Sequence, residues 1–227
     1  MWASPVGAIP TLVGVMDLAN VGAVGYPAEG SPDALLVLAH GAGAGQQHPF
    51  MVALARGFAR RGMDVVTFDF PYMRERRRIP DRAPILEKAF LETIGVARQW
   101  SRATRLFIGG KSMGGRMATH LGAAGLAGLR GLIVFGYPLH PPGKPEQPRV
   151  SHLPAITAPV LIVQGERDAF GTPQELEPVL ATMIAPVQMH VVRGGDHSLT
   201  VRGRRREDVG DEVLDLAAAW AQQQDGP

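Results

Sequence analysis

Short apolar runs alternate with amphipathic segments along most of this chain. Polar residues do not alternate with apolar ones within these runs, which is typical of strands buried on both faces of a sheet. We expect strands at residues 35–39, 65–70, 105–109, 131–135, 159–164 and 189–192. Between them, apolar residues recur every three or four positions, which predicts helices. These helices are expected at residues 49–61, 85–100, 113–121, 175–184 and 208–223.

The alternation of strands and helices predicts the α/β class. Parallel strands need crossover connections, and helices supply them, so we expect a mostly parallel central sheet with helices on both faces. The Pro-rich segment 138–154 leaves no room for a large lid domain. Residues 1–34 are rich in Gly and Pro and are ambiguous between one or two edge strands and a partly ordered arm. Without a repeat or a linker, residues 1–227 are expected to form a single domain.

The segment 109–116, GGKSMGGR, can be interpreted in two ways. A phosphate-binding P-loop requires a glycine five positions before Gly110, and that position holds Arg105. A nucleophile elbow requires a serine on a sharp turn between a strand and a helix, with small neighbours. Ser112 is predicted to lie on such a turn, and Gly110 and Gly114 supply the space. The elbow is therefore favoured, with a glycine-rich helix start capped by serine as the simpler alternative.

Two later loops offer partners for Ser112 in the order acid, then histidine, that an elbow enzyme requires. The fifth predicted strand opens into GERD, where Asp168 is the candidate acid and Glu166 is the fallback. A surface turn with solvated acids would have the same sequence. The last predicted strand is followed by GGDHS, and His197 is the candidate base. Asp196 is not expected to contribute, because adjacent residues rarely converge on one imidazole.

The loop after the first predicted strand, residues 40–45, reads HGAGAG. Its glycines allow the backbone to approach an anionic oxygen closely. We expect the backbone N–H groups of Ala42 and Met113 to form an oxyanion hole, with Gly41 shaping the turn. His40 is expected to have a structural role.

Several polar side chains are expected near the same edge of the sheet. We assign to substrate binding Gly41, Tyr72, Arg74, Lys111 and His140. Arg116, Lys144, Arg149 and His152 are further basic residues expected there. This convergence suggests a substrate with an anion near its ester or amide, and solvated loop charges are the alternative.

Composition narrows the function classes. The 23 basic and 21 acidic residues leave a formal net charge of +2, which does not suggest a nucleic-acid-binding protein. Without cysteine there is no thiolate metal site, and we expect neither a metal nor a cofactor. No run of about 18 apolar residues predicts a membrane helix, and the N-terminal segment lacks the pattern of a signal peptide. We expect a cytoplasmic monomer or small homo-oligomer that acts on a small molecule.

The motifs together resemble a known family. They are AHGAGAG (39–45), FDFPYMRERR (68–77), GGKSMGGR (109–116), GYPLHPPGKPEQPRVSHL (136–153), VQGERDAFG (163–171) and GGDHSL (194–199). This set resembles a group of predicted α/β hydrolases related to the dienelactone-hydrolase-like proteins. It also resembles the hydrolase-like domains of testis-expressed and chromatin-complex proteins of animals. The resemblance implies an α/β-hydrolase fold and a Ser112–Asp168–His197 triad, without implying a substrate. The segment Ser198-Leu-Thr-Val departs from the family pattern.

Two function hypotheses follow from the sequence. The first is a serine hydrolase that acts on an ester or other acyl bond through an acyl-enzyme. The second is a catalytically silent binding or scaffold protein with the same fold, because fold alone does not establish activity.

Overall fold

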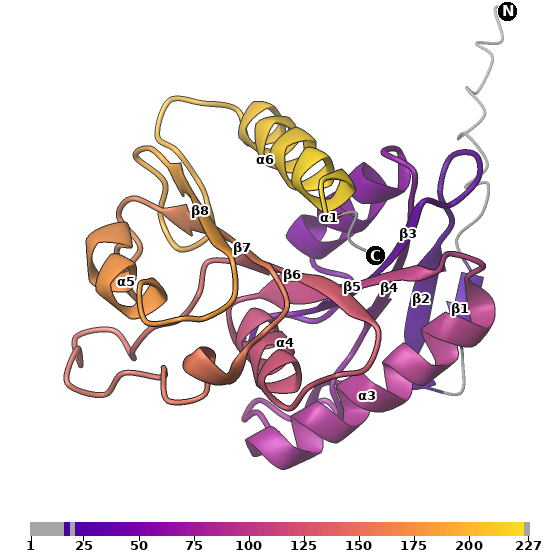
Figure 1. Cartoon of the computed structure of the whole chain (residues 1–227), viewed down its shortest axis with the longest axis horizontal. Helices are drawn as coiled ribbons and strands as arrows, with labels where there is room; N and C mark the ends of the chain where they lie inside the picture. Colours follow the sequence, from indigo (N-terminus) through magenta and orange to yellow (C-terminus); the bar gives the residue numbers. More distant parts are fainter. Residues whose placement is uncertain (1–15, 19–20, 225–227) are drawn as a thin grey trace, which may run out of the picture.

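An eight-stranded sheet runs through the part of the chain that the computed structural model describes, residues 16–18 and 21–224 (Figure 1). The spatial order is β1-β2-β4-β3-β5-β6-β7-β8. The strands are β1 (Met16–Leu18), β2 (Ala23–Tyr26), β3 (Ala34–Ala39), β4 (Met63–Phe68), β5 (Arg105–Lys111), β6 (Leu129–Phe135), β7 (Val160–Gly165) and β8 (Val187–Val192). β1 pairs with β2 and β2 with β4 in antiparallel fashion, and every other neighbouring pair is parallel.

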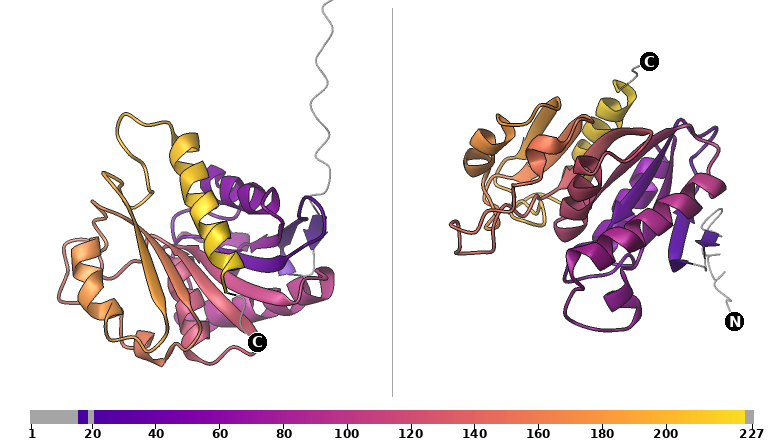
Figure 2. Two further views of the ribbon diagram at one scale, coloured as in Figure 1. Left: turned by 45° about the horizontal axis from the view of Figure 1, so that its top comes forward. Right: turned by 60° about the horizontal axis from the view of Figure 1, so that its bottom comes forward.

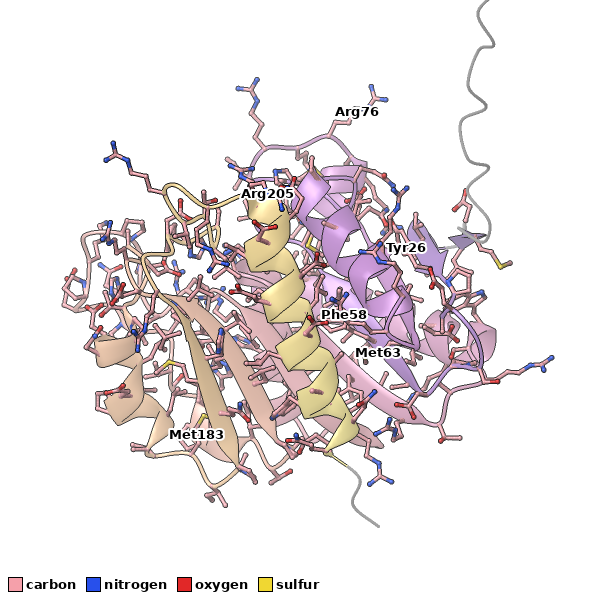
Figure 3. The ribbon with its side chains drawn as sticks, turned by 90° about the horizontal axis from the view of Figure 1, so that it is seen from above. Tyr26, Phe58, Met63, Arg76, Met183 and Arg205 are labelled. Carbon is pink, nitrogen blue, oxygen red and sulfur yellow. The ribbon has the colours of Figure 1, made fainter. Side chains whose placement is uncertain are left out.

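Helices cover both faces of this sheet (Figures 1 and 2). They are α1 (Pro49–Ala59), α2 (Pro71–Arg74), α3 (Ala83–Trp100), α4 (Met113–Ala123), α5 (Pro173–Leu180) and α6 (Arg206–Gln222), with a short 3-10 helix at Leu153–Ala155. α1 and α6 lie side by side on one face, and α3 and α4 pack together on the other. Figure 3 looks onto the α1–α6 layer and labels Tyr26, Phe58 and Met63, three residues of its core.

Burial explains why the strands are apolar throughout. All six residues of β3 are buried. Side chains alternate between the two faces of a strand, so Leu35 and Val37 enter the core beneath α3 and α4. Leu36 and Leu38 enter the core beneath α1 and α6. The mostly parallel sheet between two helical layers confirms the predicted fold class.

The element boundaries differ from the sequence predictions in a few places. β4 begins and ends two residues earlier than expected, because Phe70 leaves the sheet as the N-cap of α2. α2 is not among the predicted helices. α5 ends at Leu180 rather than at residue 184. Of residues 1–34, two segments form antiparallel strands at one side of the sheet, with β1 at its edge, and the predictions for residues 1–15 and 19–20 lie outside the described residues.

The topology places one edge of the sheet where several loops meet. The six strands β3 to β8 are parallel, so their carboxyl ends lie along the same edge. The loops that leave these ends begin at residues 40, 69, 112, 136, 166 and 193. Between β6 and β7 the chain forms only the 3-10 helix, and no lid domain covers this edge in the described chain.

Two arginine-rich segments, residues 74–78 and 202–206, lie on the surface, and three of their arginines are paired with acids. Arg77 contacts Asp81 at 2.8 Å, and Arg205 contacts Asp208 at 2.6 Å. Arg204 contacts Glu212. Figure 3 shows Arg76 projecting away from the body of the molecule. Over the described residues, no helix is long and apolar enough to cross a membrane.

One histidine between α4 and the 3-10 helix has an unusual environment. The Thr119 hydroxyl donates to the Arg116 carbonyl at 2.7 Å, so its oxygen accepts from Nε2 of His152 at 2.8 Å. Burial, and then the charges of His120 and Arg116, lower the pKa of His152 to about 4 from 6.5. His152 is therefore neutral in the folded protein at pH 5.

This histidine predicts a pH-dependent stability. Between pH 6.5 and 4 the unfolded chain binds a proton at His152 that the folded chain excludes, so stability is lost as the pH falls through this window. Because the side chain is partly exposed, we expect a contribution of only about 1–2 kcal/mol. Urea unfolding at pH 7 and pH 5 should show a smaller loss in His152→Gln than in the native protein. Equal losses in both proteins would contradict this assignment.

Candidate active site

Ser112 lies on a tight turn between β5 and α4. Its φ of 51° and ψ of −114° place a non-glycine residue in a rarely occupied backbone region. The Ser112 N–H donates to the Phe135 carbonyl at 3.0 Å, which fixes the turn against β6. A Cβ on Gly110 or Gly114 would lie 2.2 or 2.3 Å from the Ala39 carbonyl oxygen. The small residues predicted around the serine therefore allow α4 to start directly against β3.

Ser112, His197 and Asp168 form a continuous chain of hydrogen bonds. Nε2 of His197 lies 2.9 Å from Oγ of Ser112, and Nδ1 lies 2.8 and 2.9 Å from the two Asp168 oxygens. An ionised carboxylate only accepts, so Nδ1 carries the proton and Nε2 is free to accept the serine proton. The structure thus brings together the three residues that the sequence placed on three separate loops.

Asp168 is buried and its position is fixed by two further donors. Its side chain is fully shielded from solvent. Nε2 of Gln164 donates to Oδ2 at 2.9 Å, and the Phe170 N–H donates to Oδ1 at 2.8 Å. The Gln164 amide is itself oriented, because its Oε1 accepts from the Tyr137 N–H at 2.8 Å. Gln164 is a polar residue at the end of an otherwise apolar strand, and that signal could have identified it from the sequence.

The alternative acid, Glu166, has a different role. Its Oε2 accepts from the Gly194 N–H at 2.7 Å, so it ties together the turns that carry Asp168 and His197. The adjacent Asp196 accepts from the N–H groups of Ser198 and Thr200 within its own loop. The geometry therefore assigns the contact with the imidazole to Asp168.

Two side chains hold His197 in place. The Phe170 ring stacks on the imidazole with centroids 4.2 Å apart. The Lys111 ammonium donates to the His197 carbonyl, so this lysine contacts the backbone of the histidine rather than its ring. Burial lowers the pKa of Lys111 to about 8, and the nearby carboxylates of Asp168 and Asp196 oppose that shift. Lys111 supports the imidazole in this structure, whereas the sequence assigned it to substrate binding.

The loop at residues 40–46 passes directly beside the serine. A Cβ on Gly41 would lie 3.7 Å from Cβ of Ser112. Neither Ala42 nor Met113 uses its backbone N–H in any of the turn, loop or cap hydrogen bonds between backbone groups of the described residues. They are the two groups that the sequence predicted for an oxyanion hole.

Residues behind this loop hold its shape. The Tyr72 hydroxyl donates to the Ala42 carbonyl at 3.0 Å. Nε2 of His40 accepts from the Phe70 N–H at 3.0 Å, which leaves Nδ1 to donate to the Gly41 carbonyl at 2.7 Å. Burial is the main cause that lowers the pKa of His40, consistent with a neutral ring. His40 thus has the structural contacts expected from the sequence.

Three residues that the sequence assigned to substrate binding make contacts within the protein. Tyr72 is fully buried behind the loop that it supports. Arg74 donates to the Val21 carbonyl at 3.2 Å, at the β2 end of the sheet. His140 is buried, with Nε2 3.3 Å from Glu175 of α5. Their positions after strands were predicted well, but the direction of each side chain depends on packing that the sequence pattern does not specify.

Comparison with known proteins agrees with this geometry. Residues 32–224 match the family described as "Alpha/beta hydrolase domain". The chain belongs to the α/β-hydrolase family. This match covers most of the chain and identifies it as a hydrolase, as the resemblance of its motifs predicted. Within the described chain, no group of three or more His, Cys, Asp or Glu side chains is arranged to hold a metal ion.

Solved structures share the fold at low sequence identity. A dienelactone hydrolase from Anabaena variabilis superposes with a TM-score of 0.69 at 17% identity, over 88% of this chain and 90% of the other. Est1E from Butyrivibrio proteoclasticus gives 0.66 at 17% identity, over 89% and 93%. An alpha-beta serine hydrolase homologue from Coxiella burnetii gives 0.69 at 15% identity, over 87% and 90%. These superpositions show that the chain shares its fold with the three proteins.

Proposed function

We propose that this hydrolase cleaves an ester bond of a small soluble substrate through a covalent acyl-enzyme on Ser112. The observation that carries the proposal is the hydrogen-bonded chain from Ser112 through His197 to Asp168. A nucleophile within hydrogen-bond reach of a base, itself oriented by a third group, is the arrangement that serine acyl transfer requires.

The proposed reaction has two halves. His197 takes the Ser112 proton as Oγ attacks the ester carbonyl, and the charged imidazole is stabilised by Asp168. The N–H groups of Ala42 and Met113 donate to the oxyanion. His197 then protonates the leaving alcohol as the C–O bond breaks. In the second half, water gives its proton to His197, attacks the acyl carbon and releases the acid, and the proton returns to Ser112.

The open edge of the sheet favours a small substrate. Only a three-residue 3-10 helix stands between β6 and β7, so no helical lid encloses a long acyl chain. Two structural neighbours are named as a dienelactone hydrolase and an esterase domain. Their names support an ester or lactone as the bond that is cleaved.

A fluorophosphonate probe tests this proposal directly. We expect the native protein to be labelled at Ser112, and we expect Ser112→Ala to remain unlabelled. Ser198→Ala is the matched control, because Ser198 is an exposed serine next to His197 and should not affect labelling. A folded native protein that resists the probe would contradict the proposal and favour the silent binding protein.

The support that Lys111 gives to His197 leads to a second prediction. Met keeps most of the side-chain volume but cannot donate to the His197 carbonyl, so the imidazole should be less well aligned. We expect Lys111→Met to lower kcat for a neutral ester about 10-fold, with little change in KM. Steady-state kinetics would check this, with Lys88→Met on the exposed face of α3 as the control. A rise in KM at constant kcat would instead identify Lys111 as a substrate contact.

A further inference from the structure

Two arginines lie beside the first turns of α4. Arg116 follows Ser112 by four residues, and its N–H donates to the Ser112 carbonyl at 2.9 Å. This spacing separates the two backbone positions by a rise of about 6 Å along the helix axis, and helix side chains lean towards the N-terminus, the end at which Ser112 lies. Arg149 lies in the loop between β6 and β7, where its N–H donates to the Leu139 carbonyl at 2.7 Å and its carbonyl accepts from the Tyr137 hydroxyl.

Neither guanidinium forms an ion pair with a carboxylate of the described residues. The Nε atom of Arg116 is buried and has no hydrogen-bond partner among those residues. Glu87 attracts the Arg116 charge, but its carboxylate is held by Nδ1 of His120 at 2.7 Å. Buried donors in proteins are normally hydrogen-bonded, so an unpaired one needs an explanation.

The two arginines repel each other. Burial, and then the charge of Arg149, lower the pKa of Arg116. Both side chains are half-buried, so water screens this repulsion only in part. A guanidinium presents a planar set of donors that matches a carboxylate, and such charge-assisted bonds are stronger than neutral ones. An anion placed between the two would offset the repulsion and accept from both guanidinium groups.

We propose that Arg116 and Arg149 form a subsite for a free carboxylate of the substrate. The enzyme would then prefer esters of dicarboxylic acids with one free acid group, a few bonds from the scissile carbonyl. This inference rests on the proposed ester hydrolysis and specifies its substrate class. Lys111, which the sequence also assigned to an anion site, is already engaged by the His197 carbonyl.

A matched pair of esters tests the preference. Mono-p-nitrophenyl glutarate ends in a carboxylate, and p-nitrophenyl pentanoate ends in a methyl group at the same position. We expect the native enzyme to show the higher kcat/KM for the glutarate. Arg116→Met should lower the ratio of the two kcat/KM values by about 10- to 100-fold, the range expected for losing a hydrogen bond to a charged group. Arg149→Met should lower it in the same direction.

Arg56 provides a control on the other face of the sheet. Arg56→Met should keep the native ratio, because Arg56 is an exposed residue of α1 on the opposite face of the sheet. A native preference for the pentanoate, or an unchanged ratio in both arginine variants, would overturn the subsite. If Arg116→Met does not fold, Arg149→Met decides the question, because its position is in a loop.

A binding measurement separates this inference from the proposed function. Calorimetric titration of glutarate into Ser112→Ala should show binding. The double variant that also carries Arg116→Met should show none. That result would support the subsite even if no ester were hydrolysed. Labelling by the fluorophosphonate together with absent glutarate binding and an unchanged ester ratio would retain the proposed function and reject the subsite.

Discussion

Replacing Ser112 with alanine is expected to lower kcat for p-nitrophenyl esters by at least about 10⁴-fold. The variant loses the only atom that receives the acyl group in the proposed reaction. The oxyanion donors and the His197–Asp168 pair remain, so a small residual rate above that in water is expected. Initial rates corrected for spontaneous hydrolysis would measure this loss, and thermal unfolding would show that the fold is intact.

Companion variants sharpen this test. His197→Gln should lose a similar factor, because nucleophile and base act as a unit. Asp168→Asn should also lose activity, by about 10⁴-fold, since an amide cannot hold the imidazole in the required tautomer. If Ser112→Ala kept more than a few per cent of the native rate, the nucleophile would have to be another residue.

Replacing Gly114 with alanine should strongly destabilise the folded protein. An added Cβ would lie 2.3 Å from the oxygen and 2.5 Å from the carbon of the Ala39 carbonyl, and 2.6 Å from the His40 carbonyl oxygen. All three atoms belong to the backbone, so no side chain can rotate away. α4 would have to move off β3, at a cost of about 3 kcal/mol or more. Urea unfolding would measure this loss.

Gly95→Ala provides the opposite case. Gly95 lies on the exposed side of α3, and a Cβ there would meet no atom within 4 Å. We expect this variant to be more stable than the native protein by about 0.5–1 kcal/mol, because alanine favours the helix. Comparable destabilisation in Gly114→Ala and Gly95→Ala would show that the close contact of α4 with β3 is not the cause of the stability lost in Gly114→Ala.

The sequence allowed the fold and the central contacts to be predicted because their signals are local. A strand, a turn and a helix follow one another around Ser112, and each signal lies within a few residues. His197 could be placed because it is the only histidine in the sequence after the last predicted strand. The edge strands before Ala34 remained ambiguous, because short Gly-rich segments carry little hydrophobic periodicity.

The supporting contacts could not be predicted, because they join residues distant in the sequence. Tyr72 reaches back 30 residues to the Ala42 carbonyl. The stacking of Phe170 on His197 depends on how two loops meet, and so does the contact of Glu166 with the Gly194 N–H. Residue type and position after a strand assigned Tyr72, Arg74 and His140 to substrate binding, and their contacts with Ala42, Val21 and Glu175 could not be predicted from the sequence.

The bond from Lys111 to the His197 carbonyl has a mechanical consequence. Lys111 directly precedes Ser112, so the nucleophile and the base are joined twice, through Oγ to Nε2 and through Nζ to the backbone. A displacement of the histidine loop would therefore pull the serine turn in the same direction. We expect the attacking oxygen and its proton acceptor to stay in register during thermal fluctuations, even where the surrounding rim is open to solvent.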